Sequence, residues 1–218
     1  MIRLEGLCKS YRQGGRRITI ADHITAEFPA GAVVGLLGRN GAGKSSLLRM
    51  IAGSLRPDAG QILTRGRISY PLGLASALHG DLTGAQNARF VARLYGADTQ
   101  DCCRFTEDFA DLGAAFYSPV RRYSSGMKAR LAFGINMALD FDTYLLDEAL
   151  TAGDAAFLER SRALLQGRLR HAGALVVSHA PGQLRRICRQ GAVLENGHLT
   201  LFDSIDEALD HHHAGMRA

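Results

Sequence analysis

Gly38-Arg39-Asn40-Gly41-Ala42-Gly43-Lys44-Ser45 is the stretch that decides the fold of this 218-residue chain. It fits the pattern G-x-x-x-x-G-K-[ST] without a mismatch. The apolar run 32–37 before it is typical of a strand buried on both faces, and Leu47, Leu48 and Ile51 after it recur at helical spacing. A strand, a glycine loop and a helix in this order indicate a phosphate-binding loop.

The residue types in this loop suit a nucleotide. Glycines let backbone N–H groups approach phosphate oxygens, and the positive end of the helix dipole favours the same anion. We expect Lys44 to reach the β- and γ-phosphates and Ser45 to ligate Mg²⁺, whereas the alternative is a glycine turn that only caps a helix. The predicted nucleotide-binding residues of the loop are Gly38, Arg39, Asn40, Gly41, Ala42, Gly43, Lys44, Ser45 and Ser46.

A pair of carboxylates narrows the reaction. The apolar run 144–146 reads as a strand that ends at Asp147, where a carboxylate can hold the Mg²⁺ shell together with Ser45. Glu148 follows directly, and a carboxylate there can polarise a water for attack on the γ-phosphate. The pair therefore favours hydrolysis over kinase chemistry, although acidic residues at a strand end can also simply begin a helix.

The flanking sequence predicts two further parts. Residues 1–30 alternate apolar and polar around Gln13-Gly14-Gly15, which is typical of short antiparallel strands. From about 73 to 139 the pattern becomes helical, beginning with Thr83 and Gln86 in the spacing of a capping box. We expect an antiparallel β subdomain at the start and a helical lobe inserted after the phosphate loop.

The helical lobe continues with two more predicted helices. A second is expected through Leu112, and a third begins at Ser124 or Ser125 as N-cap. Strand patterns return after the lobe. Residues 158–169 look helical, residues 174–177 form an apolar strand, and residues 193–201 read as a hairpin around an Asn-Gly turn. The order of strand and helix indicates a βαβ unit and hence a parallel sheet.

Composition excludes several classes of protein. With 46% hydrophobic and 22% charged residues the chain is neither disordered nor a disulfide scaffold, and its longest apolar runs are too short to span a membrane. The net charge is +5, but the arginines are scattered, so we expect no nucleic-acid partner. A solvated helix face is the favoured interpretation of Arg185, Arg186 and Arg189, with a membrane-facing surface left open. We expect the four cysteines to be reduced thiols and the chain to be cytosolic. Residues 211–213 are expected to form a frayed histidine tail.

Five further residues give the chain a family resemblance. Tyr123-Ser124-Ser125-Gly126-Met127 lies about twenty residues before Asp147 at a predicted helix start. Together with the phosphate loop and the carboxylate pair, it resembles the signature of the nucleotide-binding subunits of ABC transporters, and the resemblance spans nearly the whole chain. Ser124 and Gly126 match that signature, whereas Tyr123, Ser125 and Met127 depart from it. A stretch usually containing a glutamine, here residues 69–73, has none.

The resemblance implies roles for individual residues. Ser124, Ser125 and Gly126 would meet the γ-phosphate held by a partner subunit. Asp154 matches the aspartate of the D-loop, His179 the switch histidine, and Tyr11 the aromatic residue that stacks on adenine. The implied catalytic residues are Lys44, Glu148 and His179, and the implied metal ligands are Ser45 and Asp147.

The implied fold is an α/β P-loop NTPase of ABC type. It has a RecA-like parallel-sheet core, an N-terminal antiparallel β subdomain and an inserted helical lobe at about 73–139, in one nucleotide-binding domain over 1–218. The cofactors would be ATP and Mg²⁺. The partners would be a second copy of the chain and a separate integral-membrane permease, which would hold the ATPase peripherally on the cytoplasmic side of the bacterial inner membrane.

Finer motifs resemble the ATPases that export capsular polysaccharide in Gram-negative bacteria. These are Tyr70-Pro71-Leu72-Gly73-Leu74, residues 82–84 and 90–95, and Thr151-Ala152-Gly153-Asp154. Related O-antigen and teichoic-acid export ATPases are the alternative, but many of the former carry a C-terminal carbohydrate-binding domain that this sequence lacks. Two alternatives come from other functional classes. One is a non-transport ABC scaffold or translation factor, and the other is a P-loop kinase.

Overall fold

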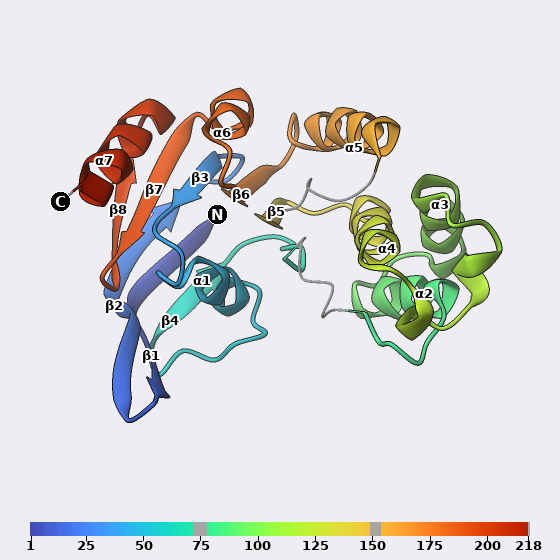
Figure 1. Cartoon of the computed structure of the whole chain (residues 1–218), viewed down its shortest axis with the longest axis horizontal. Coiled ribbons are helices and arrows are strands. Elements are labelled where there is room, and N and C mark those ends of the chain that lie inside the picture. The colour runs from blue at the N-terminus through green and yellow to red at the C-terminus, as the bar shows by residue number, and fades with distance from the viewer. Residues whose placement is uncertain (72–77, 149–153, 218) are drawn as a thin grey trace. The chain divides into compact units, whose positions relative to one another are not determined.

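The computed structural model describes residues 1–71, 78–148 and 154–217, and the chain forms two compact units (Figure 1). The core unit contains residues 1–71, 141–147 and 169–218. The helical unit contains residues 72–140 and 148–168, and so includes the predicted lobe together with a later segment.

An antiparallel sheet opens the core unit. β1 (Ile2–Gln13) pairs with β2 (Arg16–Phe28) through the predicted turn at Gly14 and Gly15, so the N-terminal β subdomain is confirmed. On its other edge β1 pairs with β4 (Ala59–Thr64), a strand that the sequence pattern missed. All but one of the β4 residues are exposed, so no alternation of apolar and polar residues marks it.

A second, mostly parallel sheet carries the phosphate loop. Its order is β5 (Thr143–Asp147), β6 (Gly173–Val177), β3 (Val33–Leu37), β7 (Gln190–Glu195) and β8 (His198–Phe202). The first four strands run parallel, while β8 returns antiparallel to β7 through the predicted Asn196-Gly197 turn. β5 is buried except at Asp147 and β6 is buried throughout, as expected for strands covered on both faces.

Three helices accompany the sheets of the core unit. α1 (Lys44–Ile51) begins at the phosphate loop and buries Leu47 and Leu48 in a core shared by both sheets. α6 (Pro181–Ile187) follows β6, and exposed Arg185 on it pairs with Asp206 at 2.6 Å. α7 (Ile205–Arg217) lies along β7 and β8 in Figure 1.

The expectation of a frayed histidine tail was wrong. Residues 211–213 lie in α7, whose Ala208 and Leu209 are buried. The helix approaches β7 so closely that a Cβ built on Gly191 would lie 2.3 Å from the Ala208 Cβ. The histidines concealed this helix because they interrupt the apolar pattern that continues from Ile205 to Leu209.

Helices dominate the second unit. They are α2 (Gly84–Leu94), α3 (Thr99–Ala110), α4 (Ser125–Met137) and α5 (Ala155–Arg168), with short 3-10 turns at Gly113–Tyr117 and Val120–Arg122. The capping box of α2 is confirmed, since the Gln86 N–H donates to Thr83 Oγ1 at 3.1 Å and the Thr83 N–H donates to Gln86 Oε1 at 2.9 Å. The predicted continuation to Leu112 was wrong, because α3 ends where Asp111 takes a left-handed conformation with φ 51°.

Aromatic rings hold three of these helices together. The Phe109 ring of α3 lies 5.6 Å from that of Phe133 on α4 and 5.5 Å from that of Phe157 on α5, measured between centroids.

Among the described residues, no helix combines the length and apolar character that crossing a membrane requires.

Candidate functional site

The phosphate loop follows β3 and leads directly into α1, as the sequence predicts. Gly38 and Gly43 have φ of 148° and 103°, a region that other residues rarely adopt. A Cβ on Gly38 would lie 2.4 Å from the Leu194 carbonyl oxygen, and one on Gly43 would lie 2.2 Å from Cγ2 of Ile20. Side chains at these two positions would therefore push the loop away from the strands that support it.

Lys44 lies folded over the loop. Its Nζ donates to the Gly38 carbonyl oxygen at 2.7 Å and to the Arg39 carbonyl oxygen at 3.1 Å, and the side chain is buried. The Ala42 N–H donates to the Arg39 carbonyl oxygen at 3.0 Å and tightens the turn, which leaves Arg39, Asn40 and Gly41 exposed. The ammonium group is thus positioned at the bend where a phosphate would bind.

The start of α1 provides the remaining groups of the loop. Its N-cap is Gly43, which offers no side chain to the N–H groups of the first turn, and those N–H groups have no acceptor within the helix. Ser45 and Ser46 lie in this first turn, partly exposed. The loop and helix start therefore present backbone donors, an ammonium and hydroxyl groups to one anion.

Strand order places two further predicted residues at the same edge of the sheet. Asp147 ends β5 and is half-buried, and His179 follows β6, the strand between β5 and β3. Because the three strands are parallel, their carboxyl ends meet at the edge that carries the phosphate loop. α1 contacts β5, so the Ser45 hydroxyl and the Asp147 carboxylate come from adjacent elements, and both are oxygen donors of the kind that Mg²⁺ prefers.

A cavity of about 140 Å³ adjoins this edge within the core unit. Gly38 and Lys44 line it together with Ser178 and His179. Its other wall includes residues of α7 that the sequence interpretation did not place near the site, namely His212, His213 and Met216. If residues 205–217 had been recognised as a helix that packs against β7, His212, His213 and Met216 would have been placed near the site.

The signature residues lie at the start of α4 in the helical unit. Ser124 is the N-cap, and its Oγ accepts the Met127 N–H at 3.2 Å, so the first of the two predicted cap positions is confirmed. Ser124 and Ser125 are exposed and Gly126 is half-buried. The neighbouring Tyr123 is buried and donates to the Ala115 carbonyl oxygen at 2.5 Å, which anchors the segment from behind.

Asp154 is tied to the signature helix by an arginine that sequence reasoning missed. Asp154 Oδ1 accepts the Phe157 N–H at 2.8 Å and caps α5, while Oδ2 forms an ion pair with Arg130 of α4. The hydrogen bond from the Phe157 N–H, together with the nearby Arg130 guanidinium, lowers the pKa of Asp154 below its ordinary value. The Arg130 guanidinium also lies 4.8 Å from the centroid of the Phe157 ring. The sequence offered one signal for Arg130, namely its position on the signature helix six residues after Ser124.

The remaining predicted residues are placed as follows. Glu148 comes directly after β5, belongs to the helical unit, and is exposed with φ 53°. Tyr11 is 40% exposed on β1, and the Lys9 ammonium lies 5.6 Å from its ring centroid. The matches at 72–74 and 151–153 lie outside the described residues.

Comparison with known proteins decides the family. The family model described as ABC transporter matches residues 21–151, more than half of the chain. This chain belongs to the ABC transporter family. The predicted family, the ABC-type α/β fold and the ATPase class are thereby confirmed.

Related ABC proteins match over almost their full length. The ATP-binding protein BexA of Haemophilus influenzae is 41% identical over 97% of this chain and 98% of that protein. The polysialic acid transport ATP-binding protein KpsT of Escherichia coli is 42% identical over 96% and 95%. The capsule polysaccharide export ATP-binding protein CtrD of Neisseria meningitidis serogroup B is 41% identical over 98% and 99%.

Solved ABC cassettes share the fold. A dimeric ATP-binding cassette in a post-hydrolysis state, bound to ADP and phosphate, superimposes with a TM-score of 0.78 at 20% identity over 94% of this chain and 99% of that one. The ATP-binding subunit of another ABC transporter gives a TM-score of 0.80 at 21% identity over 98% and 99%.

Proposed function

We propose that this chain is the ATP-hydrolysing subunit of an exporter that moves capsular polysaccharide across the bacterial inner membrane through a separate permease. The observation that carries the proposal is an identity of 41% to 42% over nearly the whole length of relatives named for capsule polysaccharide export and polysialic acid transport. The whole chain, 1–218, then works as one nucleotide-binding domain.

The core unit holds the nucleotide. Backbone N–H groups of the loop and the first turn of α1 bind the phosphates, and Lys44 moves its ammonium from the two loop carbonyls to the β- and γ-phosphates. Ser45 and Asp147 would hold Mg²⁺, which when bound would neutralise charge on the phosphates. Tyr11 stacks its exposed ring on adenine.

Two groups act on the attacking water. Glu148 polarises the water for in-line attack on the γ-phosphate, since its carboxylate follows the strand that carries Asp147. His179, which follows β6 at the same edge of the sheet as the loop, contacts the γ-phosphate and holds the reacting group in line.

A second copy of the chain completes each site. Ser124, Ser125 and Gly126 form an anion site at a helix start of the helical unit, and in the proposed head-to-tail pair this site meets the γ-phosphate on the partner's loop. Asp154 follows it across the same contact, positioned by Arg130. That a solved cassette of similar fold is dimeric supports the pairing of two chains.

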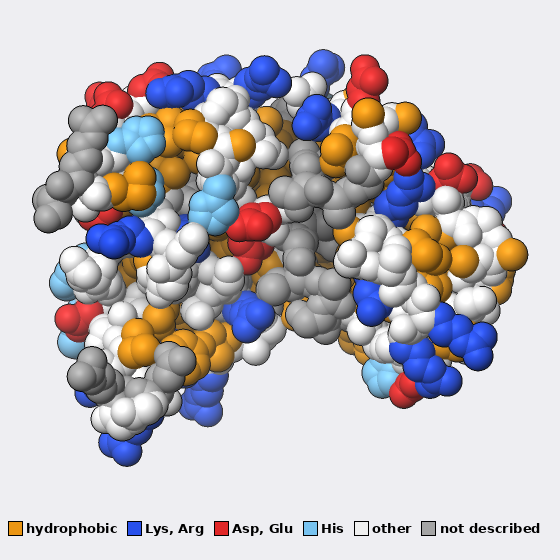
Figure 2. All heavy atoms as spheres, viewed as in Figure 1, with side chains coloured by type: hydrophobic (Ala, Val, Ile, Leu, Met, Phe, Trp, Pro, Cys, Tyr) orange, Lys and Arg blue, Asp and Glu red, His pale blue; other side chains and the backbone are white. Residues whose placement is uncertain are grey.

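The helical unit is the proposed contact with the permease. α2 exposes 51% of Phe90 and 67% of Leu94, flanked by exposed Arg89 and Arg93, and such apolar residues favour a protein partner. Docking there places the chain peripherally on the cytoplasmic face of the inner membrane. On the face that Figure 2 shows, Lys and Arg side chains lie among acidic and apolar ones, and the proposal includes no nucleic-acid partner.

A deletion strain tests the proposal. The strain should lose its surface capsule and accumulate polymer in the cytoplasm. The wild-type gene should reverse both defects, and a gene that carries Lys44→Ala should reverse neither. Retention of the capsule with loss of O-antigen instead would favour the related polysaccharide exporters. Retention of both with a defect in translation would contradict transport.

A further inference from the structure

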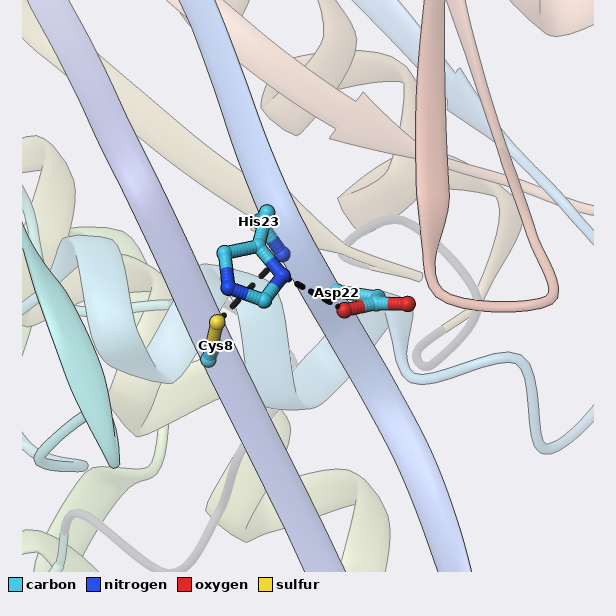
Figure 3. Close-up of side chains that lie close together, drawn as sticks. All are labelled: Cys8, Asp22 and His23. Carbon is cyan, nitrogen blue, oxygen red and sulfur yellow. Dashed lines mark hydrogen bonds and ion pairs between the residues drawn. The ribbon is translucent and has the colours of Figure 1, made fainter.

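Three side chains with metal-binding atoms meet on the antiparallel sheet of the core unit, outside the proposed nucleotide site. They are Cys8 on β1 and Asp22 and His23 on β2. Their ligand atoms, a sulfur, a carboxylate oxygen and a ring nitrogen, all lie within 4.8 Å of one another. Figure 3 shows the His23 ring between the Cys8 sulfur and the Asp22 carboxylate.

A β-bulge brings these residues together. Leu7 pairs with Ile24 and Lys9 with Ala21, so two residues of β2, Asp22 and His23, stand opposite Cys8 alone. Regular pairing would turn neighbouring side chains to opposite faces of the sheet. The bulge instead allows Asp22 and His23 to face the same sulfur, with His23 at φ 51°.

Hydrogen bonds already order the three groups. The His23 backbone N–H donates to Cys8 Sγ at 3.4 Å. His23 Nδ1 lies 2.7 Å from Asp22 Oδ1. The Asp22 backbone is fixed from the second sheet, because its N–H donates to the Gly197 carbonyl oxygen at 2.8 Å.

We propose that Cys8, Asp22 and His23 form a binding site for a divalent transition-metal ion of the Zn²⁺ class. A thiolate and an imidazole select such ions over Mg²⁺ and Ca²⁺, and the thiolate and carboxylate together balance the two positive charges. Binding replaces the thiol proton, which leaves to solvent, with a metal–sulfur bond. Water fills the fourth position of the tetrahedron.

The geometry requires little change to accept the ion. Zinc bonds of ~2.0 Å to nitrogen and ~2.3 Å to sulfur place neighbouring ligands about 3.5 Å apart in a tetrahedron. Asp22 and His23 are exposed, at 49% and 82% of their side chains, so rotation about their side-chain bonds can adjust the present separations to these values. The adjacent cation does not oppose binding, since Lys9 pairs with Asp58 at 2.8 Å.

The bound ion would link β1 to β2 three residues before Tyr11. This site is independent of the proposed function, because none of its ligands belongs to the nucleotide site. Its effect on the chain would be a stiffer β1–β2 hairpin, which carries Tyr11.

Titration of the reduced, chelator-treated full chain with Co²⁺ tests the proposal. A cobalt–thiolate site gives a charge-transfer absorption band that histidines alone do not give, so the signal separates this site from His211 and His213. We expect the band in the wild-type chain, its displacement by Zn²⁺, and its loss in Cys8→Ser and His23→Ala. Asp22→Asn removes a direct ligand, so it should weaken cobalt binding by at least the roughly 10-fold that loss of a ligand's hydrogen-bond partner costs.

The controls make each result decisive. His211→Ala and His213→Ala should keep the band, and Cys8→Ser should keep ATP binding, which shows that the variant folds. Cys102, Cys103 and Cys188 are buried, and burial raises the pKa of Cys188 to about 12, so they are poor competitors for the ion. Absence of the band in the wild type, or its persistence in Cys8→Ser or His23→Ala, would overturn the proposal.

Discussion

At the scale of single residues, we expect Lys44 to carry the charge that draws a polyphosphate to the loop. Its ammonium is buried against two loop carbonyls, which a phosphate oxygen can replace as acceptors. Hydrogen bonds to charged groups contribute about 1.5–3 kcal/mol each, so the lysine has a large effect on affinity.

Lys44→Ala should therefore bind Mg-ATP about 10- to 100-fold more weakly than the wild type. Calorimetric titration of the monomeric chain measures this, and Lys128→Ala, which removes a lysine of the helical unit, is the matched control. An affinity unchanged by Lys44→Ala would remove the assignment of the phosphate loop.

Glu148→Gln should keep ATP affinity and lose turnover. The amide preserves the shape of the side chain but cannot accept a proton from water, so the hydrolysis rate should fall by about 10²- to 10⁴-fold. Steady-state phosphate release with a parallel binding titration separates the two effects. Turnover close to the wild-type rate would mean that another group, first of all His179, places the water.

At the scale of elements, Thr83 joins the N-terminus of α2 to its first turn by two reciprocal hydrogen bonds of 3.1 and 2.9 Å. Thr83→Ala should lower the free energy of unfolding by about 1 kcal/mol, the usual cost of losing such a cap. Urea denaturation measures the change. Gln86→Ala removes the second hydrogen bond of the same capping box. The double variant should therefore lower the free energy of unfolding by less than the sum of the two single variants, and a strictly additive loss would contradict the coupling.

Asp154 gives α5 a stability that depends on pH. The pKa of this carboxyl lies below its ordinary value of 3.8, so its contribution is complete above that value and disappears as the pH falls through the lowered folded pKa. Asp154→Ala should accordingly unfold more readily than the wild type at neutral pH, and the difference should vanish in strong acid. Denaturation at a series of pH values checks this, and a difference that persists in strong acid would show that the carboxylate is not its source.

Elements with a strong local signal could be predicted from the sequence. The Gly-rich loop, the Thr83–Gln86 box and the Asn196–Gly197 turn each follow from residue types that only a few conformations accommodate. β4 and α7 could not, because β4 is largely exposed and three histidines interrupt the apolar pattern of α7. Both form through pairing and packing with distant strands.

The same distinction holds for the candidate site. The predicted loop, Asp147 and His179 meet at one sheet edge because parallel strands align their carboxyl ends. Arg130 and the cavity wall of His212 and His213 escaped prediction, because helix packing brings them there. The position of Arg130 six residues after Ser124 was a signal, but it does not identify Asp154 as the partner. The roles of the site residues remain predictions.

At the scale of the whole molecule, the proposed ATPase is a pair of chains. The phosphate loop belongs to the core unit, and the exposed helix start at Ser124, the proposed anion site, belongs to the helical unit. In a head-to-tail pair each chain supplies one half of two equivalent nucleotide sites. Ser124→Arg places a bulky cation where the partner's γ-phosphate would bind, so this variant should keep ATP binding in the monomer but lose pairing and hydrolysis.

The mass of the Glu148→Gln chain in solution, measured by light scattering with and without Mg-ATP, tests the shared site most directly. This variant should hold ATP without hydrolysing it, so the account predicts a monomer that doubles its mass when ATP is added. Glu148→Gln combined with Ser124→Arg should stay monomeric under the same conditions. A Glu148→Gln chain that remains monomeric with ATP bound, alongside a wild-type monomer that hydrolyses ATP, would contradict the account.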